Sequence, residues 1–131
     1  MVDFDRFVEG HITTIETNDQ AKSVCIEITD RYGKKARLVA SGVREVVAIE
    51  MRLQNIIDRI SVWNSASKDS LYRESLHLLI CGTLSVRSDD LNSPIIDTVV
   101  DSIKRGELIF LEIEPVYGAL ILLTGKEVSI S

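Results

Sequence analysis

The stretch that decides the fold class is SVCIEITDRYGKKARLVAS, residues 23–41. Apolar residues recur at every second position from 24 to 28, and the same period of two returns from 36 to 40. This period is typical of a strand with one buried face. The intervening DRYGK supplies a turn, in which Gly33 can adopt a positive φ. The stretch therefore predicts a β-hairpin and an antiparallel sheet.

The segments on either side of this hairpin extend the predicted sheet. Residues 11–16 are rich in Thr and Ile and end near the turn formers Asn18 and Asp19, so we expect a strand there. Residues 43–63 fit either one helix or two strands, because their apolar positions match both periods. Dense β-branched residues favour two strands, and the phase of alternation changes at Gln54 and Asn55, where we expect a kink or bulge.

Two helices are predicted downstream. The first covers residues 68–81, with Ser67 as the N-cap, Leu71 on its inner stripe and Gly82 past its end. The second begins at the Ser93-Pro94 pair, which suits an N-cap followed by a first helical residue. Its apolar stripe is formed by Ile95, Ile96, Val99, Val100 and Ile103.

The C-terminal stretch, residues 106–131, predicts further strands. Ile109, Leu111 and Ile113 share one face, whereas the opposite face is apolar at Phe110 and acidic at Glu112. Residues 119–123 are apolar throughout, as expected for a central strand that is covered on both faces, and a last strand follows. The predicted fold class is α+β: a mainly antiparallel β-sheet with two α-helices packed on it.

Composition restricts the class of protein. A length of 131 residues with 45% hydrophobic content fits one globular domain, residues 1–131. The longest apolar run is far shorter than a membrane span, and the acidic N-terminus does not resemble a signal peptide. We expect Cys25 and Cys81 to be free, buried thiols. Together these features predict a cytoplasmic protein with no membrane partner.

The sequence contains no recognisable catalytic or metal-binding motif. Neither His11 nor His77 has a Cys or His partner at the spacing of a metal site, and there is no glycine-rich phosphate loop or nucleophile elbow. We therefore predict no catalytic residue, no metal and no cofactor. An enzyme that uses a cleft around His11, or a pair of carboxylates, stays an open alternative.

The charge distribution favours a basic protein partner over nucleic acid. The net charge is −5, whereas a nucleic-acid-binding protein needs a positive face. The basic cluster around Tyr32 is confined to one hairpin turn. Residues 89–114 contain seven acids and two bases, which could form a negative surface. The candidate contact residues are Asp89, Asp90, Asp97, Asp101, Glu112, Glu114 and Tyr117.

In its general character the chain resembles the immunity proteins of bacterial contact-dependent and polymorphic toxin systems. The shared features are small size, acidic balance, one α+β domain, and the absence of an export signal and a catalytic motif. The stretches GVREVVAIEMRLQNII and EPVYGALILL also look like patterns in bacterial protein families. The resemblance implies a toxin inhibitor that binds a cognate toxin, such as a nuclease with a basic cleft, by protein–protein interaction. The alternative is a structural or assembly subunit, such as a homodimer.

Overall fold

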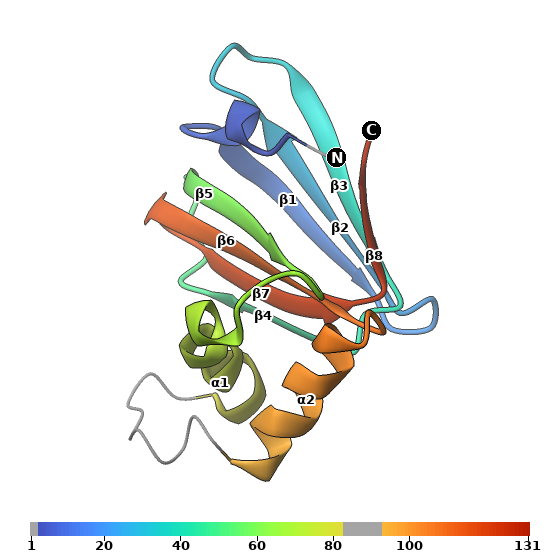
Figure 1. The fold of residues 1–131 in the computed structure, drawn as a ribbon. Helices are drawn as coiled ribbons and strands as arrows, with labels where there is room; N and C mark the ends of the chain where they lie inside the picture. Colours follow the sequence, from blue (N-terminus) through green and yellow to red (C-terminus); the bar gives the residue numbers. More distant parts are fainter. Residues whose placement is uncertain (1–2, 83–92) are drawn as a thin grey trace.

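The computed structural model describes residues 3–82 and 93–131 of the chain (Figure 1). Its described strands form one antiparallel sheet in the order β4-β7-β6-β5-β1-β2-β3-β8. The strands are β1 (His11–Asn18), β2 (Ser23–Thr29), β3 (Lys35–Ser41), β4 (Glu45–Ile49), β5 (Ile56–Trp63), β6 (Ile109–Tyr117), β7 (Leu120–Gly125) and β8 (Glu127–Ile130). The helices are η1 (Asp5–Phe7), η2 (Asp69–Leu71), α1 (Arg73–Cys81) and α2 (Pro94–Lys104).

The sheet folds over on itself, so that its two halves face each other. On one side, two chain connections cross from one half of the sheet to the other: β3 continues through Gly42 into β4, and β7 continues into β8. The connected segments also pair with each other, β3 with β8 and β4 with β7. Gly42 has a φ of +61°, and a Cβ there would collide with the Lys126 side chain. On the other side, the pair His11 and Ile56 joins β1 to β5. The folded sheet resembles a flattened barrel.

Aliphatic side chains fill the space between the two halves. Alternate residues of β2 and β3 point inward and meet the inward residues of β5, β6 and β7. The most deeply buried members of this core are Phe7, Ile26, Leu38, Leu111, Ile113, Ile121 and Leu123. Burial of these side chains drives the sheet to close, because each removes apolar surface from water.

The two α-helices cover the outer face of the half formed by β4, β7, β6 and β5 (Figure 1). A second core lies between them and this face; it includes Leu76 of α1, Val100 of α2, Phe110 of β6 and Leu122 of β7. Strands β6 and β7 are therefore covered on both faces, as the apolar run 119–123 predicts for β7. The α+β prediction is confirmed. None of the helices in the described ranges combines the length and apolar character that crossing a bilayer requires.

Local predictions were confirmed where alternation or capping is strong. The 23–41 hairpin forms β2 and β3, and the 43–63 stretch contains two strands. In α2 the Ser93 hydroxyl accepts a hydrogen bond from the Ile96 N–H, as predicted for an N-cap. However, the expected bulge at Gln54 and Asn55 is instead a loop, residues 50–55, since β4 and β5 are not neighbours in the sheet.

Predictions for the first helix need correction. Ser67 does not cap α1, since its hydroxyl accepts a hydrogen bond from the Asn64 N–H, and a 3₁₀ turn comes before the helix. Leu71 lies in that turn and is exposed, not part of the inner stripe. Cys81 is exposed at the end of α1 and Cys25 is half-buried, so the two thiols are free but not both buried.

Candidate functional site

Four large apolar side chains are exposed on two neighbouring segments at one end of the folded sheet. Met51 and Leu53 lie in the β4–β5 loop, and Val116 and Tyr117 lie where β6 turns toward β7. The Leu53 side chain is fully exposed, and Tyr117 is half-exposed. We call these four residues the tip surface. Exposed large apolar groups are unremarkable singly, but a group of them marks a site of interaction.

The buried side chain of Asn55 fastens the two segments of the tip surface to each other. Its Oδ1 accepts hydrogen bonds from the Arg52 N–H at 3.0 Å and the Ala119 N–H at 2.9 Å. Its Nδ2 donates to the Arg52 carbonyl at 2.8 Å. The Arg52 guanidinium lies over the Tyr117 ring, with its central carbon 5.3 Å from the ring centroid. The β4–β5 loop and the β6–β7 turn therefore form one unit.

Backbone conformation at this end reflects the close approach of the two segments. Gly118 has a φ of +91°, and a Cβ there would lie 2.8 Å from the Gln54 carbonyl oxygen and would collide with the Asn55 side chain. Glu50, which begins the loop, also has a positive φ, of 59°. A non-glycine residue in that region is strained by about 1 kcal/mol or more. The surrounding hydrogen bonds stabilise the loop against this strain.

A groove of about 650 Å³ lies beside the tip surface, between α1 with η2 and the outer face of β5 and β6. Within the described residues, its charged lining comprises the carboxylates of Asp58, Glu74, Glu112 and Glu114 and the cation of Arg59. Its apolar lining includes Trp63, Leu78 and Leu120. Pro115, which precedes the exposed Val116, lies at the boundary between groove and tip. We call this feature the acidic groove.

Glu112 is the most deeply buried carboxylate of the acidic groove. Only 7% of the residue is exposed, because it lies on the face of β6 that α1 covers. Burial raises the pKa of the Glu112 carboxyl, a hydrogen bond with Ser75 lowers it, and the neighbouring Glu114 carboxylate raises it. The net direction is upward. The sequence leaves two interpretations of Glu112 open, a solvated residue at the end of a strand or a residue that contacts the partner. In the structure Glu112 lies inside the groove.

Replacing Glu112 with Gln is expected to stabilise the fold at neutral pH, because a neutral amide avoids the cost of burying the ionised carboxylate. Since its folded pKa is raised, the folded state holds a proton that the unfolded state releases earlier. The stabilising contribution of this group is therefore present below its unfolded pKa and is lost as pH rises through its folded pKa. Urea unfolding of both proteins at several pH values checks this; a Gln variant that is less stable at neutral pH contradicts it.

Glu114 is already paired within the chain. Its Oε2 accepts from the Arg59 Nε at 2.7 Å and lies 2.6 Å from Arg59 Nη2. The two residues are cross-strand partners in β5 and β6, so the pairing follows from sheet register. The Glu114 carboxylate is accordingly half-covered and charge-compensated, whereas Glu112 has no ion-pair partner within residues 3–82 and 93–131.

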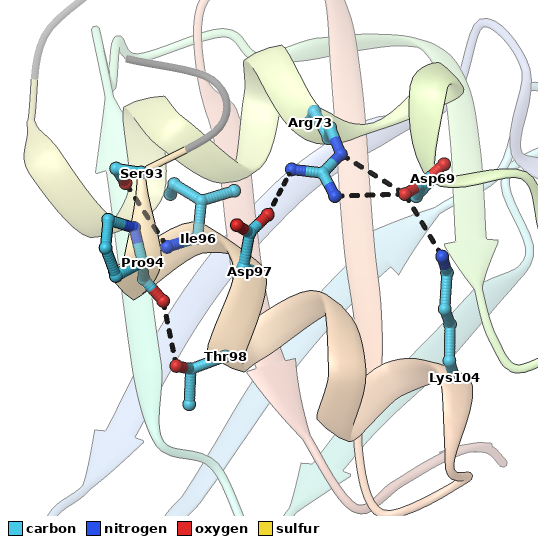
Figure 2. Close-up of polar contacts among 8 residues, drawn as sticks. All are labelled: Asp69, Arg73, Ser93, Pro94, Ile96, Asp97, Thr98 and Lys104. Carbon is cyan, nitrogen blue, oxygen red and sulfur yellow. Dashed lines mark hydrogen bonds and ion pairs between the residues drawn. The ribbon is translucent and has the colours of Figure 1, made fainter. Parts of the chain in front are cut away.

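A second polar cluster joins the helices to each other and is shown in Figure 2. The Arg73 side chain of α1 donates to Asp69 Oδ2 through Nε and Nη2, and to Asp97 Oδ1 of α2 through Nη1 at 2.9 Å. Lys104, at the other end of α2, lies 3.2 Å from the same Asp69 oxygen. These hydrogen bonds from Arg73 and Lys104 lower the pKa of Asp69. The cluster holds α2 against η2 and α1.

The predicted contact residues are therefore divided among separate places. Glu112 and Glu114 lie in the acidic groove, and Tyr117 belongs to the adjoining tip surface. Asp97 and Asp101 lie on α2, which contributes no residue to the lining of that groove. The Asp97 carboxylate accepts a hydrogen bond from the Arg73 guanidinium, whereas Asp101 is exposed. Asp89 and Asp90 lie outside the described residues.

Charge reversal separates the roles of the two α2 carboxylates. Asp97→Lys is expected to lower the free energy of unfolding by about 1 kcal/mol or slightly more, since it removes the ion pair and places a cation beside Arg73. Asp101→Lys should change it by less than about 0.5 kcal/mol, because that side chain is exposed. Thermal and urea unfolding of the two variants provide the comparison. Equal stability of the two variants would contradict the assigned role of Asp97.

Candidate metal ligands among the described residues lie apart from one another. No three of their His, Cys, Asp and Glu side chains are grouped so that they could hold a metal ion. His77 is buried in α1, and its Nδ1 has no hydrogen-bond partner among the residues that the structure describes. His11 lies on β1 and does not line the groove.

Sequence reasoning missed Met51 and Leu53. They continue the alternation of Val47 and Ile49, which indicated a longer strand with an apolar face. The available signal was the polar sequence that follows, at Gln54 and Asn55, which marks a loop.

Comparisons with protein-family models, with curated proteins and with solved structures find no match to this chain.

Proposed function

We propose that this chain is a non-enzymatic binding protein that holds a positively charged protein partner against the tip surface and the acidic groove. The observation that carries the proposal is the tip surface itself: Leu53 and Tyr117 are exposed on segments that the buried Asn55 holds in place. Ordered loops lose little conformational entropy on binding, so exposed apolar groups on them can contribute fully to affinity.

The two neighbouring features complement each other in the way that protein interfaces do. Tyr117 with Arg52 stacked on it is the type of residue pair found at binding hot spots. Beside it, the carboxylates of Asp58 and Glu74 give the groove a negative potential. Such a potential speeds encounter with a basic surface and selects against acidic partners. A basic protein domain therefore fits this face better than nucleic acid does.

In its most specific form the proposal is an immunity protein. It binds a cognate bacterial toxin in the cytoplasm and neutralises it by occluding its active site. A nuclease toxin needs a basic cleft to hold its polyanionic substrate, and an acidic face can cover such a cleft. The net charge of −5 and the lack of any grouped metal ligands in the described part of the chain agree with inhibition by occupation of a site.

A structural or homodimeric subunit is the second candidate, and the open sheet edges favour it. Within the described sheet β8 pairs only with β3, and β4 pairs only with β7. Exposed edges can pair with a second chain. Light scattering after size-exclusion chromatography distinguishes the two: a dimer that persists in high salt favours this second candidate, and a monomer favours the first.

Co-expression tests the proposal. The product of the adjacent upstream reading frame is produced with and without this chain, and growth and co-purification are scored. Arrest of growth that this chain relieves, together with a stable complex, is the expected result. A harmless neighbour with no complex would reject the immunity role.

A further inference from the structure

We infer that the acidic groove is a receptor for a single arginine side chain supplied by the partner, with Glu112 as its carboxylate acceptor. This inference rests on the proposed function and makes it specific, because it names the chemical group that the partner inserts. The tip surface would then hold the partner's backbone nearby, while the groove binds one cationic side chain of the partner.

The dimensions and lining of the groove suit a long side chain with a charged end. Its volume of about 650 Å³ lies within the range of ligand pockets. Trp63, Leu78 and Leu120 provide apolar surface along which an aliphatic stem can pack. Trp63 also contacts Tyr72, with ring centroids 5.8 Å apart, so its position in the lining is supported from the core side, and an indole attracts a planar cation.

Among the residues that the structure describes, the charges that line the groove do not balance. Four carboxylates of this part of the chain face one guanidinium, and that guanidinium, of Arg59, is paired with Glu114. Glu112 is more than nine-tenths buried, and its hydrogen-bond partner is the neutral Ser75 hydroxyl. Arg59 also favours its ionised form, but within the described residues the ion pair of Arg59 is with Glu114. A buried carboxylate without a cation bonded to it is costly to a fold. A cation from outside would supply the missing charge at that position.

The chemistry of the groove favours a guanidinium over a metal ion or an ammonium. Its carboxylates are not grouped closely enough to ligate a metal, at least among the described side chains. Arg59 demonstrates that a guanidinium fits against one carboxylate of this face, where two of its nitrogens lie on one oxygen of Glu114. A guanidinium can bind a carboxylate through two parallel hydrogen bonds and can stack on an indole, which an ammonium cannot do.

Occupation of the groove should be linked to pH. Burial raises the pKa of the empty Glu112 carboxyl, and an arriving cation favours its ionised form. The other charged groups that line the groove are Asp58 and Arg59 on β5, Glu74 on α1 and Glu114 on β6; no histidine lines it. Affinity for arginine should therefore fall as pH is lowered toward the raised pKa of Glu112.

Trp63 gives a direct readout, because it is the only tryptophan in the chain. The full chain is titrated with the peptide acetyl-Gly-Arg-Gly-amide while Trp63 fluorescence is followed, at about pH 8 and at about pH 4, the ordinary pKa of a glutamate carboxyl. The same peptide with citrulline or lysine in place of arginine provides the neutral and the ammonium comparison. We expect the arginine peptide to bind at least about tenfold more tightly than either, and about tenfold more tightly at the higher pH.

Two matched variants test the acceptor. Glu112→Gln should abolish the preference for arginine over citrulline and the pH dependence. Glu27→Gln, on β2, removes a half-buried glutamate that is hydrogen-bonded to Arg37 and does not line the groove, so it should change neither. The inference would be overturned if the citrulline or the lysine peptide bound as tightly as the arginine peptide, or if the arginine peptide left Trp63 fluorescence unchanged. It would also be overturned if Glu112→Gln kept the parent's preference for arginine over citrulline.

Failure of this inference can be told apart from failure of the proposed function. If the arginine peptide leaves Trp63 unchanged but co-expression still relieves growth arrest, the immunity role stands and the groove is not the arginine receptor. If the peptide binds selectively while the neighbouring gene product is harmless, the receptor stands and the toxin role is rejected.

Discussion

Asn55→Ala is expected to lower the free energy of unfolding by about 3 kcal/mol, because it removes one buried and two partly buried hydrogen bonds of about 1 kcal/mol each. The loss is large for one residue, since the side chain is only 3% exposed and no water can replace it without rearrangement. The Ala119 N–H, to which it was bonded, would remain buried without that partner. Urea unfolding of the variant and the parent measures the difference.

Asn64→Ala is the matched control for this change. The Asn64 side chain also accepts a hydrogen bond from a backbone N–H, that of Ala66, but in an exposed turn. We expect it to cost less than about 1 kcal/mol. If the two asparagine variants are equally stable, Asn55 does not organise the β4–β5 loop, and the tip surface loses the rigidity that the proposed function requires.

The double variant Leu53→Asp with Tyr117→Ala is expected to weaken partner binding by at least about 100-fold. Truncating a hot-spot residue costs about 2 kcal/mol or more, and the two changes act on one surface. The fold should be nearly unaffected, because Leu53 is fully exposed and Tyr117 is half-exposed. Isothermal calorimetry with the purified partner, alongside urea unfolding of the variant, separates binding from stability.

Ile95→Asp is the control for the tip variant. Ile95 is also an exposed aliphatic residue, but it lies in the first turn of α2 and not on the tip surface. An acidic residue is favourable at a helix N-terminus, so the fold should tolerate it. We expect Ile95→Asp to bind the partner as tightly as the parent chain does, whereas the tip variant binds it weakly. Equal loss in both would show a general charge effect and contradict a localised contact.

The parts of the fold that the sequence predicted well are those specified by neighbouring residues. The 23–41 hairpin carries its own alternation and its own turn, where Asp30 Oδ1 accepts from the Tyr32 and Lys34 N–H groups. The α2 helix carries its own cap at Ser93. In contrast, the predicted first helix begins with the 3₁₀ turn η2, where Asp69 pairs with Lys104, a residue far along the chain.

The candidate site was predicted only in part, since its features depend on contacts between distant segments. Alternation placed Glu112 on the same face as Phe110, but it could not reveal that α1 covers that face. The exposure of Leu53 depends on the end of β4 and on Asn55, which binds Ala119 across the sheet. Tyr117 was identified as a contact residue because it lies at a turn, and the structure leaves it exposed.

Growth of cells that express the adjacent upstream gene, which the proposal takes to encode the toxin, is the most direct test of the central claim. The gene is induced alone, with this chain, and with the Leu53→Asp and Tyr117→Ala double variant at matched expression. The parent chain should restore growth, and the double variant should fail to do so while remaining folded. Restoration of growth by the double variant to the parental level would contradict neutralisation through the tip surface.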